Sequence, residues 1–254
     1  MRQWLLLPVF LISALSLAAE DVPAWLIMPP QSSSDIYAAG ISPRYLSDSL
    51  SFSRARQEAV TSLAKQIRVE VQTKFAEVER GPGIRSYGYT IETVDSTILR
   101  RCRGDARTVD SLLIDRYAFV LVSLPRDRKT RSSSDHSVSG AILSLDSLGI
   151  TPDWTASPPQ QPDIIYGVGI SRPYRSMADA WTHSAREARR EIAMSLSMKK
   201  ALLATERINP KMSWYEEWSE DIADVTLEYA TIQERWYDPV RKIYFTLVAY
   251  PHNQ

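Results

Sequence analysis

The chain has 254 residues, of which 44% are hydrophobic, and its 30 basic residues are balanced by 30 acidic ones. This length is enough for one or two packed domains, and a net charge of zero argues against a strongly basic nucleic-acid binder. The single cysteine excludes an intrachain disulfide, and neither it nor the three histidines show metal-ligand spacing. We therefore expect no nucleic-acid partner, no metal and no cofactor.

The first nineteen residues have the pattern of a secretory signal peptide. Arg2 precedes an apolar stretch over residues 4–17, which is too short to span a bilayer. A small-x-small pattern favours cleavage after Ala18 or Ala19. Glu20 stands where a bacterial lipobox requires its acylated cysteine, so we expect no acyl anchor. The mature chain is expected in the periplasm or in association with the outer membrane.

The chain contains an internal repeat, which we interpret as a tandem duplication. A Pro-x-Trp-x-x-x-Pro-Pro-Gln segment and a Tyr-x-x-Gly-Ile-Ser segment both recur 129 positions later. A Phe-x-Leu-Val-x-x-Pro segment recurs 126 positions later, so the second copy has lost three residues. The matched segments are 23–31 with 152–160, 37–42 with 166–171, and 119–125 with 245–251.

Each copy begins with a predicted strand and an amphipathic helix. Tyr37–Ile41 and Ile164–Ile170 are short and apolar, and turn-forming residues follow them. Small or apolar side chains then recur at four-residue steps over Ala55–Ile67 and Ser184–Leu196, which indicates a helix. Residues 67–72 alternate as a strand does, but the second copy has good helix formers at the matching positions. We therefore extend the helix through this segment in both copies.

A second helix and a β-hairpin complete each copy. Apolar residues at steps of three or four predict the second helix over Tyr89–Arg101 and Trp214–Tyr229. Two apolar segments joined by a short turn then predict an antiparallel hairpin. We expect an α+β fold of two tandem β-α-α-β-β modules, each a three-stranded sheet with two helices on one face. The hairpin strands are Val109–Ile114 with Tyr117–Leu124, and Ile232–Tyr237 with Ile243–Tyr250.

The domain organisation follows from the repeat. After the signal peptide, residues 1–19, residues 20–125 form the first predicted module and residues 152–254 the second. Residues 126–151 are predicted to be a linker, because the first part of this segment is polar and has no periodicity. The spacing of apolar residues over Ala141–Leu148 predicts a short packing helix at its end.

We find no motif of an enzyme and expect no catalytic residues. The chain has no nucleophile elbow, phosphate-binding loop or dinucleotide fingerprint. Cys102 lies among arginines that could lower its thiol pKa, but an unreactive cysteine at a helix end is favoured. Glu58 matches Glu187, and Asp95 matches Asp224. Paired carboxylates can hydrolyse glycans, but a structural role at the helices is favoured here.

Four aromatic residues of the repeat are candidates for binding. Trp25 and Trp154 are flanked by prolines. They can stack on a sugar or a partner side chain, although a buried anchor at the sheet edge is the favoured interpretation. Tyr45 and Tyr174 follow the first strand of each copy, in a loop where a binding role has more support.

Together these motifs resemble a known family. The Pro-x-Trp and Pro-Pro segments, the Tyr-x-x-Gly-Ile-Ser strand, the helical Ser-Ala-Arg-Glu-Ala of residues 184–188 and the terminal Phe-x-Leu-Val strand resemble the bacterial twenty-kilodalton outer-membrane lipoprotein family. The N-terminal domain of flagellar assembly protein T is similar in pattern. The resemblance covers both copies and implies a non-enzymatic envelope module, which in some members is lipid-anchored or part of a flagellar ring. This chain departs from the family in lacking the lipobox cysteine and in having two copies.

The resemblance and the composition lead to one function hypothesis and two alternatives. We expect an exported, non-enzymatic binding or assembly protein of the cell envelope, whose partners are envelope proteins or further copies of itself in a ring. The first alternative is peptidoglycan or glycan binding through Trp25 and Trp154. The second is a hydrolase, which requires two carboxylates of one copy in a shared cleft, about 5–9.5 Å apart.

Overall fold

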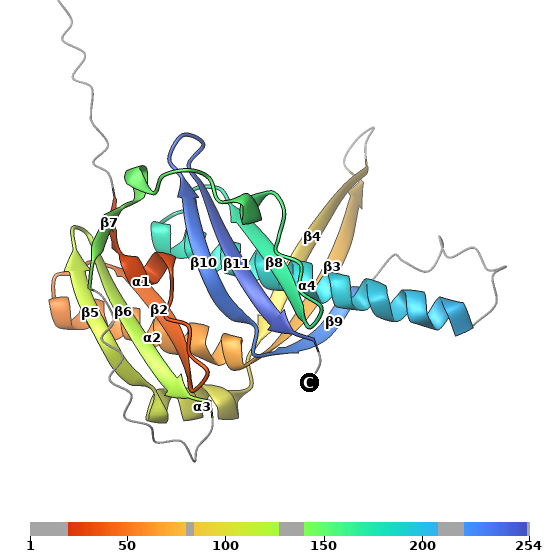
Figure 1. Ribbon diagram of the computed structural model, residues 1–254, viewed down its shortest axis with the longest axis horizontal. Helices are drawn as coiled ribbons and strands as arrows, with labels where there is room; N and C mark the ends of the chain where they lie inside the picture. The colour runs from red at the N-terminus through yellow and green to blue at the C-terminus, as the bar shows by residue number, and fades with distance from the viewer. Residues whose placement is uncertain (1–19, 80–83, 127–139, 208–220, 253–254) are drawn as a thin grey trace, which may run out of the picture.

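The computed structural model describes residues 20–79, 84–126, 140–207 and 221–252, and its mixture of helices and antiparallel sheets confirms the α+β class (Figure 1). The strands are β1 (Asp21–Pro23), β2 (Asp35–Pro43), β3 (Arg68–Glu79), β4 (Ile84–Thr93), β5 (Arg107–Ile114), β6 (Tyr117–Pro125), β7 (Ile142–Ser144), β8 (Ile164–Ser171), β9 (Asp221–Glu228), β10 (Thr231–Asp238) and β11 (Ile243–Pro251). The helices are α1 (Ala24–Ile27), α2 (Asp48–Ile67), α3 (Ser96–Asp105), α4 (Met177–Arg207) and the 3₁₀ turns η1 (Leu145–Ser147) and η2 (Asp153–Thr155).

The two halves of the chain contain sheets of the same strand order. In the first half β6 lies between β2 and β5, and in the second β11 lies between β8 and β10. The central strand β6 is apolar on both faces and is buried along Tyr117–Leu124. This burial agrees with its sequence, because such a strand needs cover on both sides. The first strand, the first helix and the final hairpin predicted for each copy are confirmed.

A matched glycine brings strand and helix close together in each half. A Cβ atom at Gly40 of β2 would overlap the carbonyl oxygen of Ala55 in α2. A Cβ atom at Gly169 of β8 would overlap the carbonyl oxygen of Ser184 in α4. Both the glycines and the two carbonyl residues are matched in the repeat. The same close crossing therefore recurs in the two halves.

The helix predicted through residues 67–72 is wrong for the first copy. There α2 ends at Ile67, and β3 begins at the next residue and pairs with β4. Val69 and Val71 are buried while the residues between and beside them are polar, which is the pattern of a strand. In the second copy α4 does continue through the matching residues. The two copies differ in secondary structure here, so the helix of the second copy wrongly predicted a helix in the first.

The second predicted helix is only partly present. In the first copy α3 begins at Ser96, and residues 89–93 of the predicted Tyr89–Arg101 helix belong to β4. In the second copy residues 221–228 form β9, and residues 214–220 of the predicted helix lie outside the described part of the chain. The prediction of two helices on one face is therefore wrong for the described residues of the second copy, where α4 packs on the sheet and β9 stands in the place of the second helix.

The two halves are joined by further pairing. β9 of the second half pairs with β3, which gives a sheet of order β4-β3-β9. β1 pairs with β7, which lies in the predicted linker. The packing helix predicted over Ala141–Leu148 is wrong, because β7 takes its first part and only the 3₁₀ turn η1 follows. Leu145 of η1 is buried in the same cluster as Phe119 of β6 and Trp181 of α4. The halves therefore share a core, and this end of the predicted linker belongs to it.

Candidate functional site

The structure places both candidate tryptophans inside the protein. Trp25, in α1, is 2% exposed, and its Nε1 donates a hydrogen bond to Asp110 Oδ2 at 2.9 Å. Trp154, in η2, is 8% exposed and packs with Trp236 and Phe245. Neither indole ring has a free face for a sugar, and both positions agree with the anchor interpretation.

The two candidate tyrosines are exposed but have different surroundings. Tyr45 is 44% exposed and lines a cavity between α2 and α4. Tyr174 is 60% exposed, and its ring stacks on His183 with the ring centroids 5.7 Å apart. Of these two matched residues, Tyr45 lies at that cavity, and Tyr174 is not part of its lining.

The matched carboxylates do not line one cavity. Glu58 lines the cavity between α2 and α4, and Asp95 is not part of its lining. Asp95 instead caps α3: its Oδ1 accepts a hydrogen bond from Thr97 N at 2.6 Å, which lowers the pKa of this carboxyl. In the second copy Glu187 lines a groove beside β8, whereas Asp224 lies in β9. This arrangement favours the structural interpretation of these residues over hydrolysis.

Cys102 and His183 have pKa values shifted by burial. Cys102 is buried, and burial raises the pKa of its thiol to about 11 despite the nearby Arg101, so the interpretation with a lowered pKa is wrong. Burial also lowers the pKa of His183. His136 lies outside the described residues. Among the residues that the structure describes, no group of three or more His, Cys, Asp and Glu side chains is placed to hold a metal ion.

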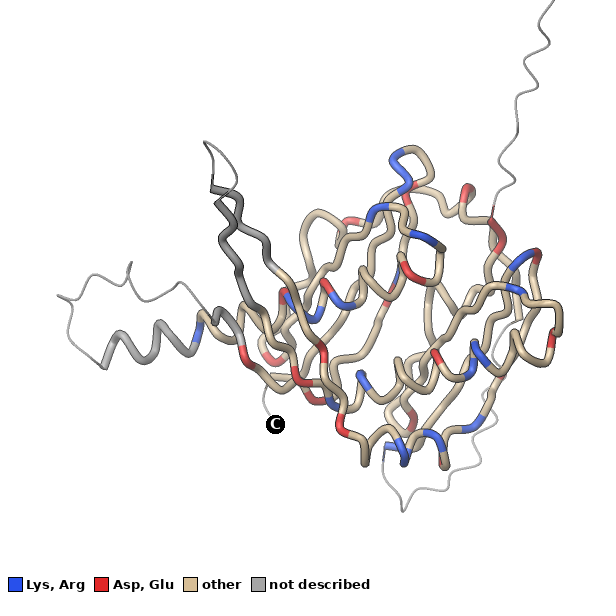
Figure 2. The backbone as a smooth tube through the Cα atoms, turned by 180° about the vertical axis from the view of Figure 1, so that it is seen from behind, with Lys and Arg blue, Asp and Glu red and all other residues tan. Residues whose placement is uncertain are grey.

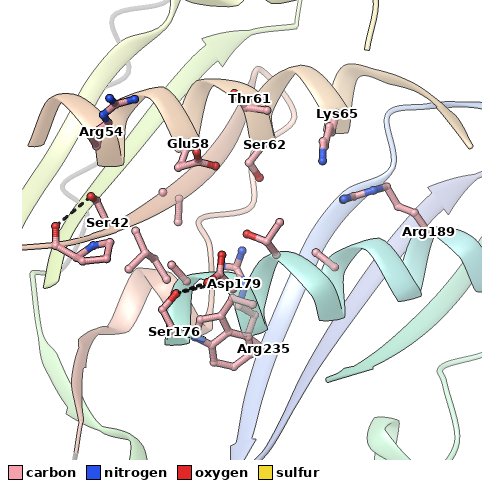
Figure 3. Close-up of a pocket in the computed structure, with 18 of the residues that line it drawn as sticks. Ser42, Arg54, Glu58, Thr61, Ser62, Lys65, Ser176, Asp179, Arg189 and Arg235 are labelled. Atoms are coloured by element: carbon pink, nitrogen blue, oxygen red, sulfur yellow. Dashed lines mark hydrogen bonds between the residues drawn. The ribbon is translucent and has the colours of Figure 1, made fainter. Parts of the chain in front are cut away.

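The feature that the sequence did not predict is a cavity of about 360 Å³ between α2 and α4. Figure 3 shows side chains from the two helices that line it, with Lys65 of α2 and Arg189 of α4 on facing sides. β2 and Arg235 of β10 also contribute, so both halves of the chain form its walls. Its charged lining residues are Arg54, Glu58, Lys65, Asp179, Arg189 and Arg235.

A buried ion network lies at one side of this cavity. Glu92 of β4 accepts hydrogen bonds from Lys65 Nζ at 2.7 Å and from Arg189 Nε at 2.6 Å. The side chains of Glu92 and Arg189 are each only 3% exposed. Burial alone would raise the pKa of Glu92, but the charges and hydrogen bonds of Arg189 and Lys65 outweigh it and lower the pKa to about 2. The network links α2 and β4 to α4.

Arg235 is a second buried cation, and its charge is not balanced in the same way. The residue is 4% exposed, and its Nη1 donates a hydrogen bond to the carbonyl oxygen of Leu26 at 2.8 Å. Its guanidinium carbon lies 5.7 Å from the centroid of the Trp181 ring, and its Nε has no hydrogen-bond partner among the described residues. Burial, together with the charge of Arg189, lowers the pKa of Arg235 to about 10.

The second half has a groove at the position that corresponds to this cavity. It lies between β8 and α4, and Glu187, Val168 and Ile170 in its wall match Glu58, Ala39 and Ile41 in the first half. In the first half α4 forms the opposite wall. Every residue that lines the groove of the second half belongs to β8 or α4 themselves, so the described part of the chain supplies no opposite wall for it.

The sequence contains one weak indication of the charged cavity between α2 and α4. Arg189 lies on a helix at the position where the first copy has Val60, which is buried. A charge at a position that is apolar in the other copy indicates a special environment, but it does not identify Glu92 as the partner. Comparison of the chain with protein-family models, curated proteins and solved structures gave no match.

Figure 2 shows the Lys and Arg positions interspersed with Asp and Glu positions along the described chain. None of the helices in the described ranges is both long and apolar enough to cross a membrane.

Proposed function

We propose that the chain is an exported, non-enzymatic binding or assembly protein of the bacterial cell envelope, built from two tandem α+β modules. The signal-peptide pattern and the resemblance to the twenty-kilodalton lipoprotein family support the location. The repeat, the equal strand order of the sheets β2-β6-β5 and β8-β11-β10 and the matched glycine crossings support the tandem modules. The regions between these shared elements have diverged.

The observation that carries a binding role is the open groove between β8 and α4. Its matching groove in the first half is walled by a helix, so a helix is the occupant that this geometry favours. Ile170 and Met198 in the groove are each 50% exposed, which gives an apolar floor for a partner side chain. Glu187, Arg190 and Glu191 also line it; Arg190 pairs with Glu187 at 2.7 Å, so the net negative charge of the groove comes from Glu191. The partner is therefore an envelope protein with an amphipathic helix that carries Lys or Arg beside its apolar face.

The free edge of β8 supports this docking mode over strand addition. β8 pairs with β11 on one side, and on the other side Val168 N donates a hydrogen bond to Glu191 Oε2 at 2.5 Å. A carboxylate in this position blocks an incoming strand, because it occupies a backbone donor of the ladder. The helix surface next to the edge stays open to a partner helix.

A second copy of this chain fits the groove less well. The α2 face that matches the cavity-lining face of α4 is partly covered by α3. Arg56 of α2, which matches Ala185, donates a hydrogen bond to Ala106 O at the end of α3, at 3.1 Å. Val60, which matches Arg189, is buried with Cys102. The α2 helix of a second copy therefore does not offer the groove the same surface that α4 offers the cavity of the first half.

In-cell photo-cross-linking tests this assignment. We expect a photoreactive residue at Met198 of the full chain to cross-link to one envelope protein, with the site mapped by mass spectrometry to a basic amphipathic helix. The same residue at Val240, which is 89% exposed in the β10–β11 turn, is the control and should not give this product. Ile170→Asp, which adds a negative charge to the groove, should reduce the product at least tenfold.

Three outcomes would overturn the assignment. One is a cross-link from position 198 to a second copy of the chain, and another is the same product from position 240. The third is a product that Ile170→Asp leaves unchanged, because a partner that ignores the groove floor does not bind there.

A further inference from the structure

The cavity between α2 and α4 has more positive than negative charge. Four cationic and two acidic side chains line it. Glu92 adds one negative charge at its side, but Lys65 and Arg189 share that charge. Arg235 has no carboxylate contact within the described part of the chain; it donates a hydrogen bond to a neutral carbonyl group and lies over the Trp181 ring. The excess positive charge is thus centred on a buried guanidinium.

The buried guanidinium of Arg235 lacks an anionic partner among the described residues. Burying a charge is unfavourable unless the charge is paired and hydrogen-bonded. Arginine does not escape this cost by losing its proton, because even the lowered pKa of about 10 keeps Arg235 charged at neutral pH. The nearby positive charge of Arg189 adds to the cost. An anion within the cavity would remove it.

We propose that this cavity binds a small molecule that carries an oxyanion, a carboxylate or a phosphate group, on the guanidinium of Arg235. The planar donors of arginine match both groups. The hydroxyl groups of Ser62 and Thr182 line the same cavity and supply neutral hydrogen-bond donors. A volume of about 360 Å³ suits a small ligand. Arg54, exposed on α2 and also in the lining, adds a positive charge that attracts anions.

This site is separate from the groove between β8 and α4. The two share no lining residue, and the ligand class differs from that of a partner helix. The failure of the cross-linking experiment therefore leaves the anion site standing, and the reverse also holds.

Titration of the purified mature chain tests the anion site. Inorganic phosphate and succinate are added in separate arms, with sodium chloride at matched ionic strength as the control, and binding is followed by calorimetry and by the melting temperature. We expect saturable binding and a raised melting temperature in the phosphate or the succinate arm, which identifies the group, and no saturation with chloride. Arg235→Gln should weaken the binding at least tenfold. Arg241→Gln, at an exposed position of the β10–β11 turn, should leave it unchanged.

A second variant keeps the test decisive if Arg235→Gln fails to fold. Ser62→Glu places a carboxylate in the cavity, and the second half already has Glu191 at the matching position. We expect it to weaken anion binding at least tenfold, because the added carboxylate offsets the excess positive charge of the cavity and repels an anion wherever in the cavity it lies. The proposal is overturned if neither anion binds the wild-type chain, or if binding survives either Arg235→Gln or Ser62→Glu.

Discussion

Glu92 shows how one residue can fix the contact between the two halves. Its carboxylate accepts hydrogen bonds from Lys65 of α2 and from Arg189 of α4, and its side chain is only 3% exposed. Buried pairs of this kind contribute little net stability compared with apolar residues, but they are costly to break. Removal of the carboxylate leaves one fully buried and one partly buried cation side by side.

We expect Glu92→Gln to lower the free energy of unfolding by about 3–5 kcal/mol, because it leaves Arg189 buried without a counter-charge. Urea denaturation at pH 7 measures this. The matched control is Glu228→Gln, whose ion pair with Arg68 is about half exposed and should be worth at most about 1 kcal/mol. Equal effects of the two substitutions would contradict the role of the network.

The lowered pKa of Glu92 also predicts how the effect of Glu92→Gln on stability changes with pH. The pKa of Glu92 is lowered from 4.5 to about 2, so the wild type gains stability from this group above pH 4.5 and loses that gain as the pH falls toward 2. Glu92→Gln lacks the titrating group, so the difference in stability between the two proteins should shrink over this interval. A constant difference from pH 5 to pH 2 would be evidence against it.

At the scale of elements, the segments whose structure follows from a local sequence pattern were predicted, and those that depend on a distant partner were not. The glycine-containing first strands, the first helices and the final hairpins carry their own periodicity and turn residues, and these were predicted correctly. β9 was not, because Ile222, Val225 and Tyr229 have helical spacing while the partner of this strand, β3, is far away in the sequence. The cationic cavity was missed for the same reason: Glu92, Arg189 and Arg235 come together only through packing of the halves.

The close crossing of strand and helix predicts which glycines tolerate a side chain. Gly40→Ala and Gly169→Ala must push the helix from the strand, because the added methyl group overlaps a backbone carbonyl oxygen in each case. We expect each to lower the free energy of unfolding by at least about 1–3 kcal/mol. Gly104→Ala in α3 is the control: a Cβ atom there meets nothing within 4 Å, and alanine favours the helix by up to about 1 kcal/mol. Chemical denaturation of the three variants separates these effects, and a Gly40→Ala variant as stable as Gly104→Ala would show that the crossing is not tight.

At the scale of the molecule, hydrogen bonds and strand pairs connect the two halves of the chain. The side chain of Gln66, which is 1% exposed, donates a hydrogen bond to Tyr37 O at 3.0 Å and accepts one from Ile232 N of the second half at 3.2 Å. β3 pairs with β9, and β1 pairs with β7. A sequence repeat indicates two similar modules, but it does not indicate whether each can fold alone.

Separate expression of residues 20–126 and 140–252 tests this interdependence. Each fragment lacks strand partners and leaves part of the shared core exposed: the first loses β9, β7 and Trp181, and the second loses β3 and Phe119. We therefore expect neither fragment alone to unfold cooperatively, because the exposed apolar surface and the unpaired strand edges favour association over a packed state. An equimolar mixture should recover a single cooperative transition in thermal denaturation, since the missing partners are then supplied in trans. A sharp, cooperative transition for each isolated fragment would contradict this prediction and show that the two halves fold independently. The network around Glu92 would then stabilise an interface between two folded domains.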